Sequence, residues 1–489
     1  MVKRFGDQHF GGDFFTTLRF EGEISDCEVE GEIPGDMHGT FYRQGGDWHQ
    51  PPKFPHDPPF SADGYISMFR FANGRVDYKG RFVRTPRFLA NQAAGRQLFG
   101  IYRNRLADDP SVRSLNSTVA NTTPLVHAGK LFALKEDSKP YEIDPHTLET
   151  KGEYDFHGKY LSPTFTAHPK IDPLTGELLA YGYEAGGEAS NDVFFYNIDK
   201  SGHVTREVRL KTPYVGMVHD IAITRSHIVI PLYGLATDKE WLAAGNIHWA
   251  WDSKLPSYVG ILPRDGDAKD LRWFKNPQGV AIHTLNAATE GNKLLLDAPV
   301  SDGNPFPFFQ DRSGAPWNPR LGTTTIRRWT FDLNSKKEGW QEENLFPTAA
   351  GALGRIDDRF TSLPYQYSYM GYHDPQQPFD IPREPGAPAF PITNSLGRFN
   401  MRTGKMDSYF AGSTGSLQEA CFVPKNKHAA EGEGYLVAVY GNIAEKRSEL
   451  VVLDAQTLEL RARVILPFRI SEQVHGVWAS HDEVPFAAK

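Results

Sequence analysis

A short β-hairpin pattern recurs along this chain and constrains its fold more than any other feature. In each copy, two β-prone segments flank a turn with Asp, Asn or Gly, residues that supply the backbone conformations of tight turns. Seven copies occur, at 68–82, 140–154, 193–210, 258–274, 326–341, 396–410 and 450–464, with one further candidate at 168–181. They recur every 50 to 70 residues or so, roughly the length of one four-stranded blade with its loops.

This spacing predicts an all-β fold in which residues 1–489 form a single β-propeller of seven blades. A large β-sandwich or a pair of barrels is the alternative, and the hairpin spacing fits it less well. The 45 Gly and 35 Pro residues agree with many turns and few long helices. Residues 87–115 and 301–322 lack hairpin turns, and we expect them to be long loops with short helices that cap the propeller axis.

Composition excludes several classes of protein. The 53 Lys+Arg and 60 Asp+Glu give a net charge of −7, which argues against a nucleic-acid partner. No apolar run reaches the ~18 residues of a membrane-spanning helix, so no membrane association is expected. Cys27 and Cys421 are too few for a disulfide framework; we expect buried thiols and a cytoplasmic protein. The apolar stretch 241–251 is expected to pack on the scaffold rather than bind a partner.

Four of the 17 histidines lie in β-like or short apolar contexts: His168, His219, His283 and His475. Their separations of 51, 64 and 192 residues correspond to about one, one and three blade lengths. Equivalent inner strands of a propeller converge on its axis, so the four imidazoles could meet there and bind a metal. Fe(II), Zn(II) and Cu(II) all suit imidazole ligands. The alternative is that each is a hydrogen-bonded core histidine, and His127 is a rival candidate in an equally strand-like context.

The segments around these histidines resemble the carotenoid cleavage oxygenase superfamily. The matching segments are TAHPKIDPLTGE, VHDIAIT, HTLNAATEGNKL, LPFRISEQVHGVWAS, GTFYRQGGD, ADGYISMFRF, LKEDSKPYEIDPHTLET and LQEACFVPKN. The resemblance runs over most of the chain and implies a seven-bladed propeller that holds Fe(II) through the four histidines. Such a site leaves coordination positions open for dioxygen.

The same resemblance implies carboxylates that orient the histidines from behind. Glu136 and Glu419 match two of the family's three glutamates and would orient His219 and His475. The third position is Ala352, in the segment ALGRIDDRF. We therefore expect weaker iron binding, because no glutamate at this position fixes the imidazole of His283.

Within the family, the chain is most similar to the bacterial lignostilbene dioxygenases and the related isoeugenol-cleaving enzymes. RTPRFLANQAAGRQLFGIYRNRLADDPSV and LFALKEDSKPYEIDP carry this likeness. It implies that Tyr102 and Lys135 hold the para-hydroxyl of a phenolic substrate. It also implies that Phe60 and Phe308 pack against a substrate ring.

The expected function is therefore an Fe(II)-dependent dioxygenase that splits the central double bond of 4-hydroxystilbenes into two aromatic aldehydes. Cleavage of isoeugenol-type side chains, cleavage of an apocarotenoid and a non-enzymatic interaction module are the alternatives. The expected partners are a phenolic stilbene and dioxygen, and the resemblance implies a homodimer.

Overall fold

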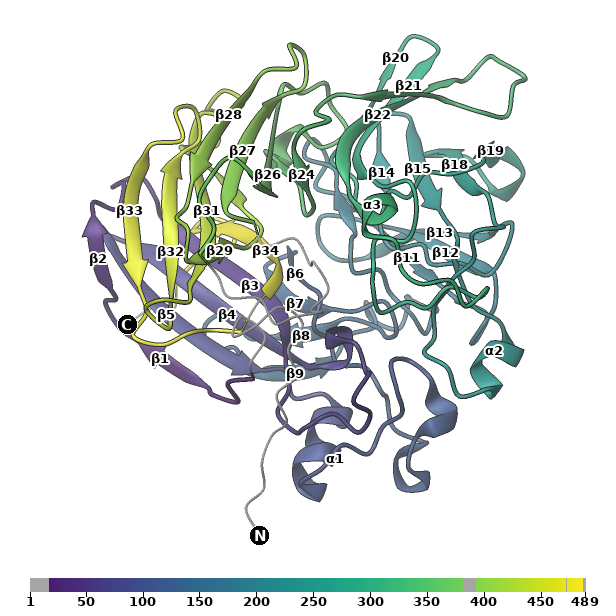
Figure 1. Ribbon diagram of the computed structural model, residues 1–489, viewed down its shortest axis with the longest axis horizontal. Coiled ribbons are helices and arrows are strands. Elements are labelled where there is room, and N and C mark those ends of the chain that lie inside the picture. The colour runs from purple at the N-terminus through teal and green to yellow at the C-terminus, as the bar shows by residue number, and fades with distance from the viewer. Residues whose placement is uncertain (1–16, 381–392, 472, 487–489) are drawn as a thin grey trace.

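The strands form seven antiparallel sheets arranged as the blades of a propeller (Figure 1). The computed structural model describes residues 17–380, 393–471 and 473–486. Within them, a two-stranded sheet of β16 (Leu235–Ala236) and β17 (Ala250–Trp251) is added to the seven blades. The predicted all-β, seven-bladed architecture is confirmed.

Each blade runs from an innermost strand near the axis to an outermost strand at the rim. In this order, blade one contains β34 (Gln473–Ser480), β3 (Gly39–Asp47), β4 (Asp63–Ala72), β5 (Arg75–Phe82) and β1 (Gly22–Ile24). Blade two contains β6 (Thr123–His127), β7 (Lys130–Leu134), β8 (Tyr141–Ile143) and β9 (Thr150–Glu153). Blade three contains β10 (Lys170–Ile171), β11 (Leu178–Tyr183), β12 (Asp192–Ile198) and β13 (Val204–Lys211).

Blades four to seven follow the same plan. Blade four contains β14 (Ala222–Ile223), β15 (His227–Leu232), β18 (Ser257–Pro263) and β19 (Arg272–Asn276). Blade five contains β20 (Asn286–Glu290), β21 (Lys293–Val300), β22 (Thr325–Asp332) and β23 (Gln341–Asn344). Blade six contains β24 (Ala350–Gly351), β25 (Arg355–Ile356), β26 (Tyr367–His373), β27 (Ser395–Asn400) and β28 (Met406–Phe410). Blade seven contains β29 (Gly415–Leu417), β30 (Cys421–Pro424), β31 (Gly434–Asn442), β32 (Arg447–Asp454), β33 (Leu460–Ile465) and β2 (Glu28–Gly31).

The seven predicted hairpins all form, and each is an outer strand pair of a different blade. They are β4–β5, β8–β9, β12–β13, β18–β19, β22–β23, β27–β28 and β32–β33. The further candidate at 168–181 is the inner pair β10–β11 of blade three. Outer hairpins are conspicuous in sequence because their strands alternate between buried and exposed positions, as the burial pattern of β5 shows.

Two pairings between distant parts of the chain close the ring. Strand β34 pairs with β3 in blade one, with His475 opposite Gln44. Strand β2 pairs with β33 at the outer edge of blade seven. Blade one therefore combines N-terminal and C-terminal strands, and blade seven takes its outermost strand from the N-terminal part of the chain.

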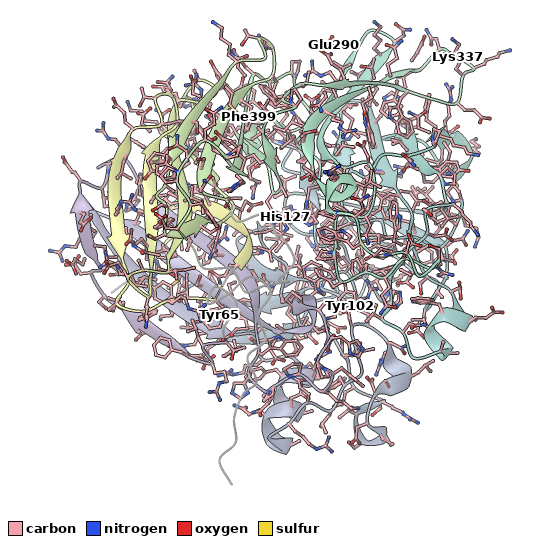
Figure 2. All side chains as sticks on the ribbon, viewed as in Figure 1. Tyr65, Tyr102, His127, Glu290, Lys337 and Phe399 are labelled. Atoms are coloured by element: carbon pink, nitrogen blue, oxygen red, sulfur yellow. The ribbon has the colours of Figure 1, made fainter. Side chains whose placement is uncertain are left out.

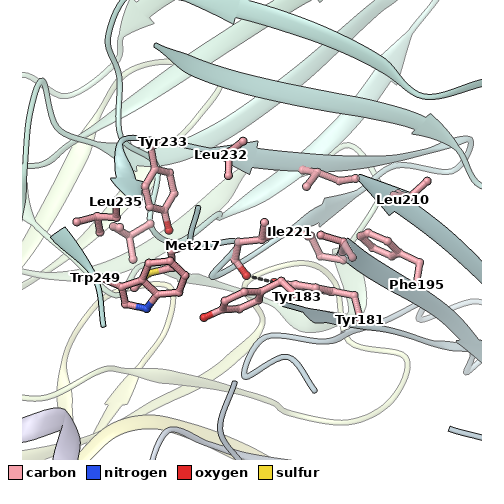
Figure 3. Close-up of a cluster of buried hydrophobic side chains, with 14 of the residues drawn as sticks. Tyr181, Tyr183, Phe195, Leu210, Met217, Ile221, Leu232, Tyr233, Leu235 and Trp249 are labelled. Atoms are coloured by element: carbon pink, nitrogen blue, oxygen red, sulfur yellow. Dashed lines mark hydrogen bonds between the residues drawn. The ribbon is translucent and has the colours of Figure 1, made fainter. Parts of the chain in front are cut away.

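The hydrophobic core is divided among the blade interfaces. Each of the seven larger clusters of buried apolar side chains lies between two neighbouring blades. Figure 3 shows the cluster between blades three and four, where Tyr181 and Phe195 face Ile221 and Leu232. Side chains fill the space between the sheets, whereas Glu290 and Lys337 project at the outer rim (Figure 2). The inner strands are thereby held in fixed positions around the axis.

Two of the helices fall in the predicted long loops, α1 (Pro86–Ala94) at the start of the first and α3 (Pro319–Gly322) at the end of the second, whereas α2 (Lys239–Ala243) lies outside both. Helix α1 is followed in the first loop by the 3-10 turns Arg105–Ala107 and Pro110–Val112. Helices α2 and α3 are single turns. The apolar stretch 241–251 packs inward as expected, with Trp249 fully buried. Within the part of the chain that is described, no helix is long and apolar enough to cross a membrane.

Candidate metal centre and substrate cavity

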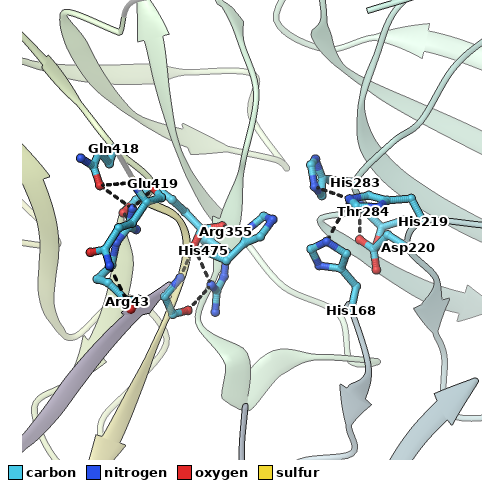
Figure 4. A network of polar contacts seen from close by, with 12 residues as sticks. Arg43, His168, His219, Asp220, His283, Thr284, Arg355, Gln418, Glu419 and His475 are labelled. Carbon is cyan, nitrogen blue, oxygen red and sulfur yellow. Dashed lines mark hydrogen bonds and ion pairs between the residues drawn. The ribbon is translucent and has the colours of Figure 1, made fainter. Parts of the chain in front are cut away.

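The four predicted histidines converge at the propeller axis. His168, His219 and His283 come shortly before the innermost strands of blades three, four and five, and His475 lies on β34 (Figure 4). The Nε2 atom of His219 lies 3.0 Å from Nε2 of His168 and 3.1 Å from Nε2 of His283. Candidate ligand nitrogens of His168, His283 and His475 lie within 4.8 Å of one another. His127 is not part of this group, since its Nε2 lies 3.2 Å from the carbonyl oxygen of Gly176.

The geometry of these nitrogens fits a bound transition metal. Two ligands about 2.1 Å from one ion and at right angles would place their nitrogens about 3.0 Å apart. The Nε2 atom of His475 is buried and has no hydrogen-bond partner among the described residues. Burial and the neighbouring imidazoles lower the pKa of His168 and of His283 well below the ordinary value, so both are neutral. A cluster of neutral imidazoles with facing lone pairs is a suitable donor set for a divalent cation.

Two of the histidines have a carboxylate behind them. Glu136 Oε1 lies 2.5 Å from His219 Nδ1, and Glu419 Oε1 lies 2.9 Å from His475 Nδ1. Each carboxylate accepts a hydrogen bond from Nδ1–H, which leaves Nε2 with its lone pair toward the axis. Burial would raise the pKa of Glu419, but Arg355 and His475 lower it to about 2. The Arg355 guanidinium, 3.1 Å from Glu419 Oε2, keeps this carboxylate ionised.

His283 differs from these two histidines. Ala352, the position at which the family resemblance implies a glutamate, lines the central cavity together with His283. An alanine methyl group cannot accept the Nδ1 proton of an imidazole. Residue 352 therefore offers no carboxylate to His283, and the expected weakening of iron binding stays a prediction.

A second set of polar contacts joins three of the histidine-bearing segments, and sequence reasoning gave it no role. Lys170 Nζ lies 2.8 Å from Asp220 Oδ1, and Asp220 Oδ2 accepts hydrogen bonds from the backbone N–H and the hydroxyl of Thr284 (Figure 4). Lys170 is two residues after His168, and Asp220 and Thr284 directly follow His219 and His283. One sequence feature could have indicated these residues. Each lies within two residues of a histidine, in the segments TAHPKIDPLTGE, VHDIAIT and HTLNAATEGNKL.

One cavity of about 400 Å³ connects the histidines with the predicted phenol-binding residues. Phe60, Tyr102 and Lys135 line it, together with His219, His283 and His475. Lys135 directly follows β7 in blade two, and Phe60 and Tyr102 lie on the loops that cover this end. The structure therefore brings Tyr102, Lys135 and Phe60 into the same space as the imidazole cluster.

The Lys135 side chain lies in a nearly closed pocket of polar and aromatic groups. Its Nζ donates to Asn121 Oδ1 at 3.0 Å and to the Phe60 carbonyl at 3.3 Å. The same atom lies 5.6 Å from the ring centre of Tyr102 and 5.8 Å from that of Phe60. Burial lowers the pKa of Lys135 and raises the pKa of Tyr102. An anionic oxygen bound here would contact the buried ammonium of Lys135 and the protonated hydroxyl of Tyr102.

The aromatic segment after β21 lines the cavity with residues other than Phe308, the one predicted from the sequence. Phe306 and Phe309 are among the cavity-lining residues, whereas Phe308 is not. Phe308 packs edge-on against Phe60, with ring centres 5.0 Å apart. A role of Phe308 in holding a substrate ring stays a prediction, and this contact would make the effect indirect.

Comparisons with known proteins show which family and which enzymes this chain is similar to. Residues 15–480 match the protein family described as retinal pigment epithelial membrane protein. The chain is 40% identical to lignostilbene-α,β-dioxygenase isozyme III of Sphingomonas paucimobilis, over 96% of this chain and 97% of that protein. It is also 40% identical to isoeugenol monooxygenase of Pseudomonas putida, over 97% and 98%. The crystal structure of Pseudomonas brassicacearum lignostilbene dioxygenase superposes with a TM-score of 0.93 at 40% identity, covering 98% of this chain and 100% of that one.

Proposed function

Because the chain belongs to the carotenoid cleavage oxygenase family, we propose that it cleaves the central double bond of 4-hydroxystilbenes with dioxygen to give two aromatic aldehydes. The observation that carries the proposal is the placement of the Lys135 ammonium beside Tyr102, in the same cavity as the imidazoles of His219, His283 and His475. Full-length similarity to enzymes named as oxygenases leaves no support for a purely structural interaction module.

His168, His219, His283 and His475 would hold Fe(II), the metal that the family resemblance implies. The ferrous ion supplies the activation of dioxygen. The protein's own contribution is to keep the Nε2 lone pairs directed at one point. Glu136 and Glu419 orient the imidazoles of His219 and His475 by accepting hydrogen bonds from their Nδ1–H groups.

Lys135 and Tyr102 would bind the phenolic oxygen of the substrate. A phenol has a pKa near 10 in water, and a neighbouring cation lowers it. The Lys135 ammonium would stabilise the phenolate, while the Tyr102 hydroxyl donates a hydrogen bond to the same oxygen. Charge from the phenolate is delocalised onto the conjugated alkene, which becomes electron-rich and reactive toward activated dioxygen.

The aromatic residues would position the substrate and keep water away. Phe60 and Phe309 line the cavity, and their ring centres lie 6.4 Å apart. The cavity is predominantly apolar between its two ends, which suits a planar stilbene. Each alkene carbon gains one oxygen atom from a single dioxygen molecule, so two carbonyl groups form and no further reductant is needed.

Cleavage of the propenyl side chain of isoeugenol-type phenols is the second candidate, because the Pseudomonas putida relative is equally similar. It uses the same phenol-binding residues. An apocarotenoid substrate would carry no phenol, so the buried Lys135 would have no function in its cleavage. Turnover of 4-hydroxystilbene and isoeugenol by the same preparation, compared as kcat/KM, decides between the first two.

The direct test is incubation of the Fe(II)-reconstituted protein with dioxygen and either 4-hydroxystilbene or 4-methoxystilbene, with aldehydes detected by mass. We expect about one iron per chain and rapid cleavage of the hydroxylated compound alone. Equal consumption of both compounds would contradict phenol activation. Failure to bind iron after reconstitution would contradict the metal site.

Two further parts of the proposal concern the protein's surroundings. Cys27 and Cys421 are buried free thiols, which supports a reducing, cytoplasmic location. Burial raises the pKa of each thiol to about 12, so neither is a reactive nucleophile at neutral pH. A homodimer remains a prediction, and sedimentation of the purified protein measures it.

A further inference from the structure

We propose that His373 binds a neutral phenolic hydroxyl on the substrate ring that Lys135 does not hold. The inference rests on the proposed stilbene cleavage and adds a second recognition point to it. A substrate bound at both points would span the cavity with its central double bond beside the imidazole cluster. The preferred substrates would then be stilbenes with hydroxyl groups on both rings.

The topology places His373 across the ring from Lys135. Lys135 follows β7 in blade two, whereas His373 is the last residue of β26 in blade six. The imidazole cluster, which comes from blades one, three, four and five, lies between these two walls. His373 and Lys135 line the same cavity, so one elongated ligand can reach both.

His373 lines this end of the cavity, and none of the described residues forms a hydrogen bond with its imidazole. Its Nδ1 atom is buried and has no hydrogen-bond partner among the described residues. The ring edge packs against Phe379, with ring centres 5.4 Å apart and planes at 87°, which fixes the orientation of the imidazole. The imidazole of His373 thus has hydrogen-bonding capacity that no other described residue uses.

The other polar side chains around His373 already have partners. The Thr393 hydroxyl donates to the Leu417 carbonyl, and the Thr324 hydroxyl donates to the Gly351 carbonyl. Both threonines line the same end of the cavity. Both hydroxyl protons are therefore used within the protein, whereas the imidazole of His373 has no such bond among the described residues.

The charges indicate what kind of group fits. Lys135 is the one lysine or arginine among the described residues that line the cavity. A carboxylate on the substrate ring near His373 would lose its hydration without gaining a cationic partner, which is unfavourable. A phenolic hydroxyl can both donate and accept a hydrogen bond, so it suits either tautomer of a neutral imidazole.

The experiment compares two substrates that differ only in the far-ring hydroxyl, 4-hydroxystilbene and 4,4′-dihydroxystilbene. We expect the wild type to have a several-fold lower KM for the dihydroxy compound. In His373→Leu, the ratio of kcat/KM for the dihydroxy over the monohydroxy compound should fall about 5- to 10-fold, the effect of one lost hydrogen bond. His373→Gln retains a hydrogen-bonding amide and should restore part of the ratio.

The exposed His428 provides the matched control, because His428→Leu removes an imidazole far from the cavity lining and should leave the ratio unchanged. Iron content and the melting temperature show whether each variant is folded. Equal KM values for the two compounds in the wild type, or an unchanged ratio in folded His373→Leu, would overturn the inference. If the wild type cleaves neither stilbene, the proposed function itself fails, which is a separate result.

Discussion

Asp220 accepts a hydrogen bond from the backbone N–H of Thr284, with 2.7 Å between Oδ2 and the nitrogen. The contact joins the segment before β14 to the segment before β20, one residue beyond His219 and His283. The other carboxylate oxygen of Asp220 pairs with Lys170, two residues beyond His168. One buried carboxylate thus sets the relative positions of three imidazoles from three blades.

We therefore expect Asp220→Asn to weaken metal binding. The amide removes the charge that pairs with Lys170 and turns one acceptor into a donor that faces existing donors. Loss of such supporting contacts costs about 10- to 100-fold in metal affinity. Competition titration with a chelator measures the Kd. Asp265→Asn, on the exposed turn between β18 and β19, is the control. An unchanged Kd in a folded Asp220→Asn protein would refute the role.

Lys135→Met should reduce kcat/KM for 4-hydroxystilbene by about 10- to 100-fold, because a hydrogen bond to a charged group is lost at a desolvated site. Iron content should stay the same, since the Lys135 ammonium bonds to Asn121 and the Phe60 carbonyl rather than to an imidazole. Lys130→Met removes a partly exposed lysine from the start of the same strand, β7, and serves as the control. Retention of full activity would instead favour a substrate without a phenol.

Ala352→Glu should strengthen metal binding. A carboxylate near His283 could accept its Nδ1 proton and fix the tautomer, as Glu136 does for His219. The expected gain in affinity is about 10-fold, measured with Fe(II) or Co(II) by competition. Ala350→Glu places the same charge elsewhere in the cavity lining and controls for electrostatics alone. An equal gain in both variants would show that orientation of His283 is not the cause.

Asp57 should make the protein less stable at neutral pH than at mildly acidic pH. Burial raises the pKa of Asp57 from 3.8 to about 6 in the folded protein, although Ser61 and the Tyr102 N–H hydrogen-bond to it. Since the folded state binds this proton more tightly, stability is gained as the pH falls through 6 and the gain is complete near 3.8.

Between pH 7 and pH 5, the wild type should gain about 1.4 kcal/mol of unfolding free energy relative to Asp57→Asn. Chemical denaturation at the two pH values measures this difference. The comparison cancels other titrating groups, Asp63 among them. A difference that is the same at both pH values would contradict the raised pKa.

The sequence allowed the architecture to be predicted from local patterns, and the histidine cluster from the family resemblance of the segments that carry it. Each outer hairpin is marked by its turn residues, and each histidine lies in a recognisable segment. The sequence does not distinguish Phe308 from Phe309, because a loop without regular periodicity does not reveal which ring faces inward. His373 and Asp220 are missed for a related reason. Their roles depend on pairings between blades, and no local spacing encodes these.

The pairing of β34 with β3 also has a consequence for the order of events during synthesis. A nascent chain that has emerged through blade six already holds His168, His219 and His283, whereas His475 leaves the ribosome only after blade seven. Strand β3 must wait for its partner until nearly the whole polypeptide has been made. The histidine cluster is therefore completed in the same late step that closes the ring, and a partly made chain holds only three of the four imidazoles.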